Sequence, residues 1–550
     1  MRAEAQPTEI DSQIDSQADL GPIKEASAIP LKRPSKTLSR WFSDKTLTKR
    51  ASLNGLAALL DYAAHVLVGF IIQPVLVTGL GPYFYGVWQI LDRLIGHMSA
   101  ASGRPGQALK FTIAHQQTST DYEEKRRNVG SAVVVWLVFL PVLAAIGGLL
   151  TWFTPAWVKA PNEFSASVRL ATALLVADLI LMSLADVPRS VLQGENLGYK
   201  RMGLSTILVF VGGGFTAVAM YFKTGLIGAA ASEVASTVLT GLLFVRIVRS
   251  YAPWFGITMP GWADVRRFFG LSWWFLVWRL VNQLMMASDV IVLGRLYSVG
   301  MVTHYTLTKY AAESVISLVA ITVFGIAPGL GGIIGAGKTR KAIRVRSEIM
   351  MGTWLIATVM GATILLWNRC FIRLWVGEKY YAGSIPALLI TLMVAQLVLI
   401  RNDANIIDLT LNLRHKVLTG TLSATMSLVF ASVLVGVFHW GIVGLCLGFM
   451  VGRSILSLGY PWLVGRFLGI SLYSQLKAVP RPACTMMGLF LLVPYLSRSL
   501  TVSTWIGLIL SAGVTVAGVS LLAFYAGLSG DQRQCILQRI RAMLRPVRVD

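Results

Sequence analysis

The hydrophobic pattern of the chain is a series of long apolar runs separated by short polar connections. A run of about 20 apolar residues is the length that an α-helix needs to cross the hydrocarbon core of a bilayer. We therefore predict an all-α polytopic membrane protein with about fourteen transmembrane helices. Their expected ranges are 52–78, 84–103, 130–152, 166–188, 202–222, 226–247, 271–293, 301–326, 348–368, 384–408, 418–438, 441–461, 483–497 and 503–527.

The connections between these runs alternate in length and charge. Those after odd-numbered spans are short, such as 223–225 and 439–440, and those after even-numbered spans are longer and rich in Lys and Arg. Because positively charged connections stay in the cytoplasm, we expect a multi-pass membrane protein with both termini cytoplasmic. We predict a disordered basic cytoplasmic tail over 1–50 and a basic amphipathic cytoplasmic tail over 529–550.

A weak internal repeat divides the chain. The turn ending at Gly86 resembles the turn ending at Gly300, and Gly225-Leu-Ile-Gly228 resembles Gly441-Ile-Val-Gly444 at nearly the same separation. Repeats of this kind build transporters that hold substrate between two related halves. We predict two pseudo-symmetric six-helix bundles and two further C-terminal helices. The expected ranges are 51–250 for the first bundle, 270–465 for the second and 480–528 for the two additional helices.

Composition agrees with this class and removes several others. The chain has 550 residues, of which 55% are hydrophobic and 14% charged, with a mean hydropathy of +0.64. A net charge of +23 would suggest nucleic acid in a soluble protein, but here the cytoplasmic loops account for it, so we expect no nucleic-acid partner. The four cysteines have no metal-ligand spacing, and we expect neither a metal site nor a cofactor.

One motif of the chain imitates a nucleotide-binding loop. The letters from Gly332 to Thr339 fit the P-loop pattern, but they follow a membrane span directly and leave no room for a parallel sheet. We read them as a basic cytoplasmic loop. A membrane glycosyltransferase or polymerase would need a sizeable extramembrane region, and the longest candidate, 369–383, is too short, so we predict that the protein is not an enzyme.

Charged residues inside the spans are the candidate chemistry. A charge at mid-membrane costs about 2.5 kcal/mol or more, so it normally faces a wet cavity or a partner. Arg93 and Lys309 occupy similar positions after Gly86 and Gly300, which suggests a transport site for an anion, and Arg279 is a third candidate by its depth. Two alternatives remain open: Arg93 forms a structural ion pair, or Lys309 is neutralised by Glu313 one helical turn away.

The acids inside the spans are candidates for coupling transport to a proton or sodium gradient. We expect this role of Asp61, Asp92 or Glu313, with Asp61 foremost because it lies deep in the first span. The alternative for Asp61 is a structural partner for Arg93 or Arg279. Asp403, near the end of the tenth span, is expected to reach the membrane surface.

The two turns carry a family resemblance. Leu80-Gly81-Pro82-x-x-Tyr85-Gly86, and the later series Asp289, Leu293-Gly294, Val299-Gly300 and Tyr305, resemble the polysaccharide-transport branch of the multidrug/oligosaccharidyl-lipid/polysaccharide (MOP) exporter superfamily. That branch includes Wzx-type O-antigen flippases and the lipid II flippase. The resemblance covers residues 50–527 and is specific for the superfamily rather than for a substrate.

The resemblance implies a flippase for an undecaprenyl-pyrophosphate-linked oligosaccharide, working by alternating access in O-antigen or exopolysaccharide biosynthesis. Its implied partners are the lipid-linked substrate, the bilayer and a polysaccharide polymerase machinery. Cations of the second and eighth helices, here Arg93 and Lys309, would line the cavity and bind the pyrophosphate, and the last two helices would border the lipid tail. The alternative is a MATE-like, cation-coupled small-molecule antiporter of the same fold.

Overall fold

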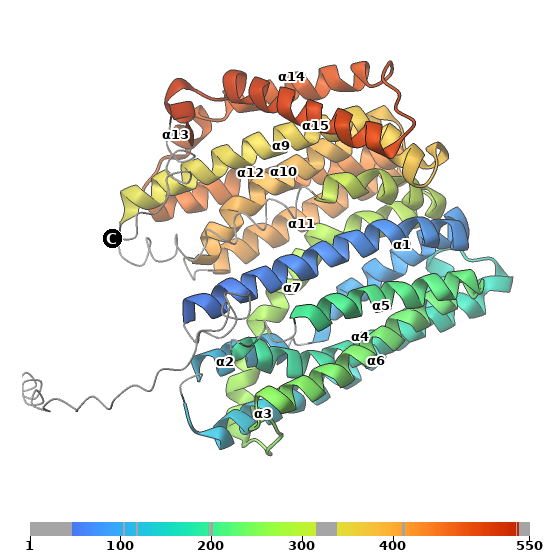
Figure 1. Cartoon of the computed structure of the whole chain (residues 1–550), viewed down its shortest axis with the longest axis vertical. Coiled ribbons are helices and arrows are strands. Elements are labelled where there is room, and N and C mark those ends of the chain that lie inside the picture. The colour runs from blue at the N-terminus through green and yellow to red at the C-terminus, as the bar shows by residue number, and fades with distance from the viewer. Residues whose placement is uncertain are drawn as a thin grey trace, which may run out of the picture. The chain divides into compact units, whose positions relative to one another are not determined.

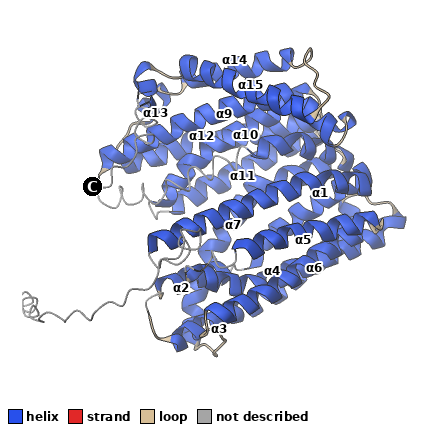
Figure 2. Ribbon diagram, in the orientation of Figure 1, coloured by secondary structure: helices blue, strands red, loops and turns tan. Residues whose placement is uncertain are grey.

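Most of the described chain is helical. The computed structural model describes residues 47–102, 105–116, 119–195, 197, 202–314, 338–409, 413–534 and 536–537, and over these ranges it contains no strand (Figure 2). The predicted tail over 1–50 lies almost wholly outside the described residues, as does most of the tail over 529–550. The backbone of Arg279 is described, but its side chain is not.

The helices coincide with the predicted spans. The first half contains α1 (Leu47–Met98), α2 (Pro105–His115), α3 (Tyr122–Trp157), α4 (Ser165–Gly194), α5 (Met202–Tyr221) and α6 (Gly225–Tyr251). The second half contains α7 (Trp262–Leu296), a helical stretch over 299–314, α9 (Thr339–Trp375), α10 (Ser384–Leu409), α11 (Leu413–Gly436) and α12 (Gly441–Leu468). The chain continues with the short α13 (Leu472–Lys477), then α14 (Pro480–Leu496) and α15 (Trp505–Leu522).

Helix length and hydropathy fit a membrane protein. Ten helical stretches among the described residues are long and apolar enough to cross a bilayer, and the first of them, Leu60–Met98, contains two predicted spans. Past residue 314 the predicted span over 301–326 lies outside the described residues. The all-α polytopic fold class is confirmed.

A single glycine turns the chain between the first two spans. Gly81, inside α1, has φ 74° and ψ 169°, a backbone conformation that a residue with a Cβ rarely adopts. Pro82 follows it, and the Pro82 carbonyl accepts a hydrogen bond of 2.5 Å from the Thr303 hydroxyl. The predicted turn is therefore present, and it packs against the start of the 299–314 helix.

Helices that are close in sequence pack together. Helix α4 packs on α2, α3 and α6, and α5 packs on α6, while α12 packs on α10 and α11 and α9 packs on α10. The last two long helices, α14 and α15, both pack on α9, as Figure 1 shows at the red end of the colour scale. Helix α7 contacts helices of both sets, namely α2 and α3 in the first half and α11 and α12 in the second.

The connection over 104–129 differs from expectation. Its mixed charges indicate a solvated loop, but the structure forms α2 there and buries Leu109 and Ile113 completely. The apolar run in this segment is too short to cross a bilayer, so a prediction based on span length does not detect this helix. Helix α2 packs on α4 and contacts α7, and thereby joins the two halves at this end of the helices.

Close backbone contact at Gly86 yields a first prediction. A Cβ at Gly86 would lie 2.3 Å from the Val299 carbonyl oxygen, so Gly86→Ala forces the two helices apart. We expect it to lower the free energy of unfolding by about 1–3 kcal/mol. Thermal unfolding of the purified protein in detergent measures this, with Gly148→Ala as the control because nothing lies within 4 Å of a Cβ there. Equal melting temperatures for the two variants would contradict the prediction.

Candidate functional site

Five charged residues from three helices meet near the middle of the helical layer. Asp92 and Arg93 come from α1, Asp289 comes from α7, and Lys309 and Glu313 come from the 299–314 helix. We call these five residues the charge cluster. Arg93 and Lys309 each lie about 15 Å along their helices from the preceding turn, which is half of a hydrocarbon core about 30 Å thick.

Lys309 is the buried centre of the charge cluster. Its Nζ lies 2.6 Å from Asp289 Oδ2 and 2.8 Å from Glu313 Oε1, and its side chain is 8% exposed. Asp289 is 2% exposed and also accepts hydrogen bonds from the Tyr305 hydroxyl at 2.6 Å and from the Val290 backbone N–H at 2.9 Å. Donors therefore surround the Asp289 carboxylate, and Lys309 is held by two acids at once.

Arg93 is held more loosely. Its Nη2 lies 4.0 Å from Glu313 Oε1 and its Nε lies 3.9 Å from Asp92 Oδ2, both longer than a hydrogen bond. The Nε atom is buried with no hydrogen-bond partner, and the side chain is 27% exposed. The guanidinium therefore has donor capacity that its neighbours leave unused.

The charge cluster has one buried side and one accessible side. Asp289 and Lys309 form the buried side, whereas the side chains of Glu313 and Asp92 are 38% and 64% exposed. A ligand approaching the cluster would therefore meet Arg93, Glu313 and Asp92 first. With two cations against three carboxylates, the five residues together carry an excess of negative charge when all are ionised.

His97 supports the cluster from the next turn of α1. Its Nδ1 donates to the Arg93 carbonyl oxygen at 2.7 Å, so Nε2 of the neutral ring accepts from the Ser288 hydroxyl at 3.1 Å. Ser288 precedes Asp289 on α7. The bond therefore holds the two helices that supply Arg93 and Asp289 in a common register.

Of the remaining predicted site residues, Asp61 lies apart from the charge cluster. Its carboxylate accepts hydrogen bonds from Ser205 at 3.0 Å and Thr206 at 3.2 Å, both on α5. These hydroxyls take the place of the arginine partner that the sequence left open for Asp61. Arg279 contributes nothing to the described site, because its side chain lies outside the described residues.

Two of the buried charges in the second half, Arg453 and Asp289, were not among the site residues proposed from the sequence. Arg453 on α12 is 3% exposed, donates to the Met285 carbonyl oxygen at 2.6 Å and lies 5.1 Å from the centre of the Phe449 ring. An arginine within the predicted span 441–461 was the signal that could have revealed it. Asp289 was recognised only as part of a turn motif, since its pairing with Lys309 depends on how α7 packs against the following helix.

The prediction for Asp403 was wrong. The sequence suggested that it reaches the membrane surface, but its side chain is 2% exposed and forms a two-bond ion pair with Arg346 at 2.8 and 2.9 Å. The partner is 57 residues away on α9, so no spacing within the tenth span could indicate it. The pair ties α9 to α10.

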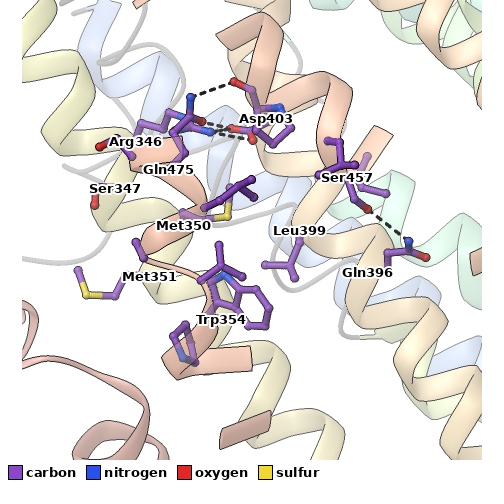
Figure 3. Close-up of a pocket in the computed structure, with 18 of the residues that line it drawn as sticks. Arg346, Ser347, Met350, Met351, Trp354, Gln396, Leu399, Asp403, Ser457 and Gln475 are labelled. Carbon is purple, nitrogen blue, oxygen red and sulfur yellow. Dashed lines mark hydrogen bonds and ion pairs between the residues drawn. The ribbon is translucent and has the colours of Figure 1, made fainter. Parts of the chain in front are cut away.

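A cavity of about 560 Å³ lies among α9, α10, α12, α13 and α14, and the Arg346–Asp403 pair forms part of its wall (Figure 3). Most of the lining is apolar, with Met350, Trp354 and Leu399 among the residues that Figure 3 labels. The volume is that of a pocket able to enclose a small organic molecule. None of the charge cluster residues lines this cavity.

No metal centre is visible in the part of the chain that the structure describes, since three or more potential His, Cys, Asp or Glu ligands do not converge anywhere in it. The charge cluster offers cationic hydrogen-bond donors and carboxylates that can bind and release ions.

Known proteins resemble the chain in sequence and in fold. The chain matches no protein-family model. It is 21% identical over 351 residues to a putative O-antigen transporter of Shigella flexneri, covering 62% of this chain and 80% of that protein. Its fold matches the lipid II flippase MurJ in an inward closed conformation with a TM-score of 0.63 at 13% identity, covering 88% of this chain and 99% of that one. It also matches an inward-facing MATE-family multidrug transporter of the MOP superfamily, with a TM-score of 0.60 at 14% identity over 77% of this chain and 99% of that one.

The apolar helices and the fold match define a multi-pass membrane protein with the fold of MATE- and MurJ-type transporters. The resemblance drawn from the sequence, to the Wzx-like polysaccharide-transport branch of the MOP exporter superfamily, is confirmed. The similar proteins are transporters and flippases, which agrees at that level with the prediction of a protein that is not an enzyme.

Proposed function

We propose that the protein is a flippase that moves an undecaprenyl-pyrophosphate-linked oligosaccharide from the inner to the outer leaflet of the bacterial inner membrane. The observation that carries this proposal is the Arg93 guanidinium inside an apolar helix: its side chain is 27% exposed, and its Nε has no hydrogen-bond partner. The similarity to a putative O-antigen transporter supports a role in O-antigen or exopolysaccharide biosynthesis, beside a polysaccharide polymerase machinery.

The charged headgroup is the part of this substrate whose transfer into the membrane is energetically unfavourable. A diphosphate placed in hydrocarbon loses its hydration, and a guanidinium replaces part of it with charge-assisted, paired hydrogen bonds. In the proposed flippase, Arg93 makes the first phosphate contact and Lys309 adds a second positive charge. No group that makes or breaks bonds is required.

In an alternating-access mechanism, the contacts between the two halves would close one end of the transporter at a time. The turn at Gly81 packs against the start of the 299–314 helix, and His97 joins Ser288. With both termini in the cytoplasm, as we propose, the two turns lie at the periplasmic end, and their contact closes that end. Exposure to the outer leaflet then requires this contact to open.

In the proposed flippase, the apolar cavity beside α14 holds part of the lipid tail. Its lining offers hydrocarbon surface between the second set of helices and the final pair. A tail held there keeps the polyprenyl chain in an apolar environment while the headgroup crosses between the halves.

A second candidate function is a cation-coupled small-molecule antiporter. The fold match to a MATE-family transporter favours it, as does the exposed acid Asp92 on the accessible side of the charge cluster. An antiporter would move a soluble cation, whereas the proposed flippase moves an anionic lipid.

Reconstituted liposomes distinguish the two functions. A labelled undecaprenyl-pyrophosphate-linked saccharide is placed in the inner leaflet, and its arrival outside is followed with a glycosidase that cannot cross the membrane. We expect proteoliposomes to expose the saccharide many times faster than protein-free liposomes. Proteoliposomes that export a cationic dye against a proton gradient, yet leave the lipid in place, would replace the flippase by the antiporter.

A further inference from the structure

A single carboxylate oxygen stands between the two cations of the charge cluster. Oε1 of Glu313 lies 2.8 Å from Lys309 Nζ, and the same oxygen lies 4.0 Å from Arg93 Nη2. A phosphate oxygen that contacted both cations would have to occupy the same place. As the structure stands, Glu313 therefore excludes the ligand that the two cations are suited to bind.

We propose that Glu313 is an internal competitor of the substrate diphosphate: its carboxylate pairs with Lys309 beside Arg93 until it takes up a proton and yields the place to a phosphate. This inference rests on the proposed flippase function and specifies how its site is regulated. One proton then enters the site with each diphosphate that binds, and it leaves when the diphosphate leaves. No covalent step is involved.

Exposure selects Glu313 among the three acids. Asp289 is 2% exposed and keeps the Tyr305 hydroxyl and the Val290 N–H as donors in addition to Lys309. Asp92 is 64% exposed but approaches only Arg93. Glu313, at 38% exposure, is both reachable from the accessible side and in contact with both cations.

The charges around Glu313 set the conditions of the exchange. The first half presents Asp92 and Arg93 on α1, α7 presents Asp289, and the helix of Glu313 itself carries Tyr305, Lys309 and Tyr310. Arg453 on α12 also interacts electrostatically with Asp289. Three cations then balance three carboxylates, so protonation of Glu313 leaves one net positive charge for an incoming phosphate.

The alternative for Glu313 is a purely structural pair with Lys309 on one helix face. It predicts no link between proton uptake and ligand binding. The two roles therefore differ in an observable quantity, the pH dependence of diphosphate affinity.

The test is a binding titration with a soluble probe. We suggest a short-chain prenyl-diphosphate-linked N-acetylglucosamine, because its diphosphate diester keeps its charge across the neutral range. Calorimetry on the purified full-length protein in two buffers of different ionisation enthalpy counts the protons taken up. We expect the wild type to take up about one proton for each probe bound, with affinity falling by up to tenfold for each rise of one pH unit once Glu313 is ionised.

The variant Glu313→Gln removes the charge and keeps the shape. We expect it to bind the probe with an affinity that no longer depends on pH and without proton uptake. Glu378→Gln is the matched control, because Glu378 pairs with Arg369 away from the charge cluster and is 44% exposed. It is expected to keep the wild-type pH dependence. Should Glu313→Gln fail to fold, Glu313→Asp retains a titrating acid and is expected to retain proton uptake.

The outcomes separate the two proposals. Wild type and Glu313→Gln binding the probe with one common pH profile would overturn the role of Glu313 and leave the flippase standing. Absence of probe binding to every folded variant at every pH would overturn the diphosphate site itself, and this inference with it. A pH dependence lost in Glu378→Gln as strongly as in Glu313→Gln would also overturn the assignment.

Discussion

Replacement of Asp289 by Ala is expected to cost about 3–5 kcal/mol in the free energy of unfolding, because it leaves a buried charge without its main partner. Lys309 lies 2.6 Å from Asp289 with only 8% of its side chain exposed, and after the replacement only Glu313, at 2.8 Å, would still pair with it. The Tyr305 hydroxyl also loses its acceptor. Thermal unfolding of the purified protein in detergent measures the loss.

Two variants show whether the loss comes from the unpaired charge. Asp186→Ala removes a partly exposed acid that lies 4.0 Å from Arg189, and it is expected to cost less than about 1 kcal/mol. The double variant Asp289→Ala/Lys309→Met removes both buried charges and is expected to regain most of the stability. A double variant as unstable as Asp289→Ala would show that the pair is not the cause.

Replacement of Arg93 by Ala is expected to slow transport of the lipid-linked saccharide by about tenfold to a hundredfold. The loss of a charge-assisted hydrogen bond to phosphate costs about 1.5–3 kcal/mol, and each 1.4 kcal/mol corresponds to about a factor of ten. Stability should change little, because the carboxylates nearest to Arg93 lie 3.9 and 4.0 Å away. The liposome assay described above measures transport, and Arg93→Lys is expected to fall between Ala and wild type.

Arg369→Ala is the matched control for this second prediction. Arg369 pairs with Glu378 at 2.5 Å, is 51% exposed and lies outside the charge cluster, so its loss should leave transport unchanged. Normal transport by folded Arg93→Ala protein would remove Arg93 from the mechanism. A variant that is inactive and also strongly destabilised would instead assign Arg93 a structural role.

Much of the fold follows from local properties of the chain. Apolar runs of sufficient length become helices in a bilayer because every backbone group must be paired within its own segment. The turn at Gly81 follows from a glycine before a proline between two such runs. The same length criterion missed helix α2. Its apolar residues face neighbouring helices over a run too short to span a membrane.

The candidate site was predicted less completely. Arg93, Asp92, Lys309 and Glu313 stand out in the sequence because charges are rare inside apolar runs. Their convergence with Asp289 could not be derived, because it depends on how α1 and the 299–314 helix pack against α7. The same limit applies to Asp403 and Arg346, which come from different helices.

By itself, then, the sequence determined that this chain is a polytopic helical membrane protein with charged residues at mid-membrane depth, because hydrophobicity and helix length act locally. Only the tertiary structure decided which of those charges meet. It buried Lys309 between two acids and left Arg93 with unused donors, since the pairing of side chains on separate helices depends on register and rotation that no local pattern encodes.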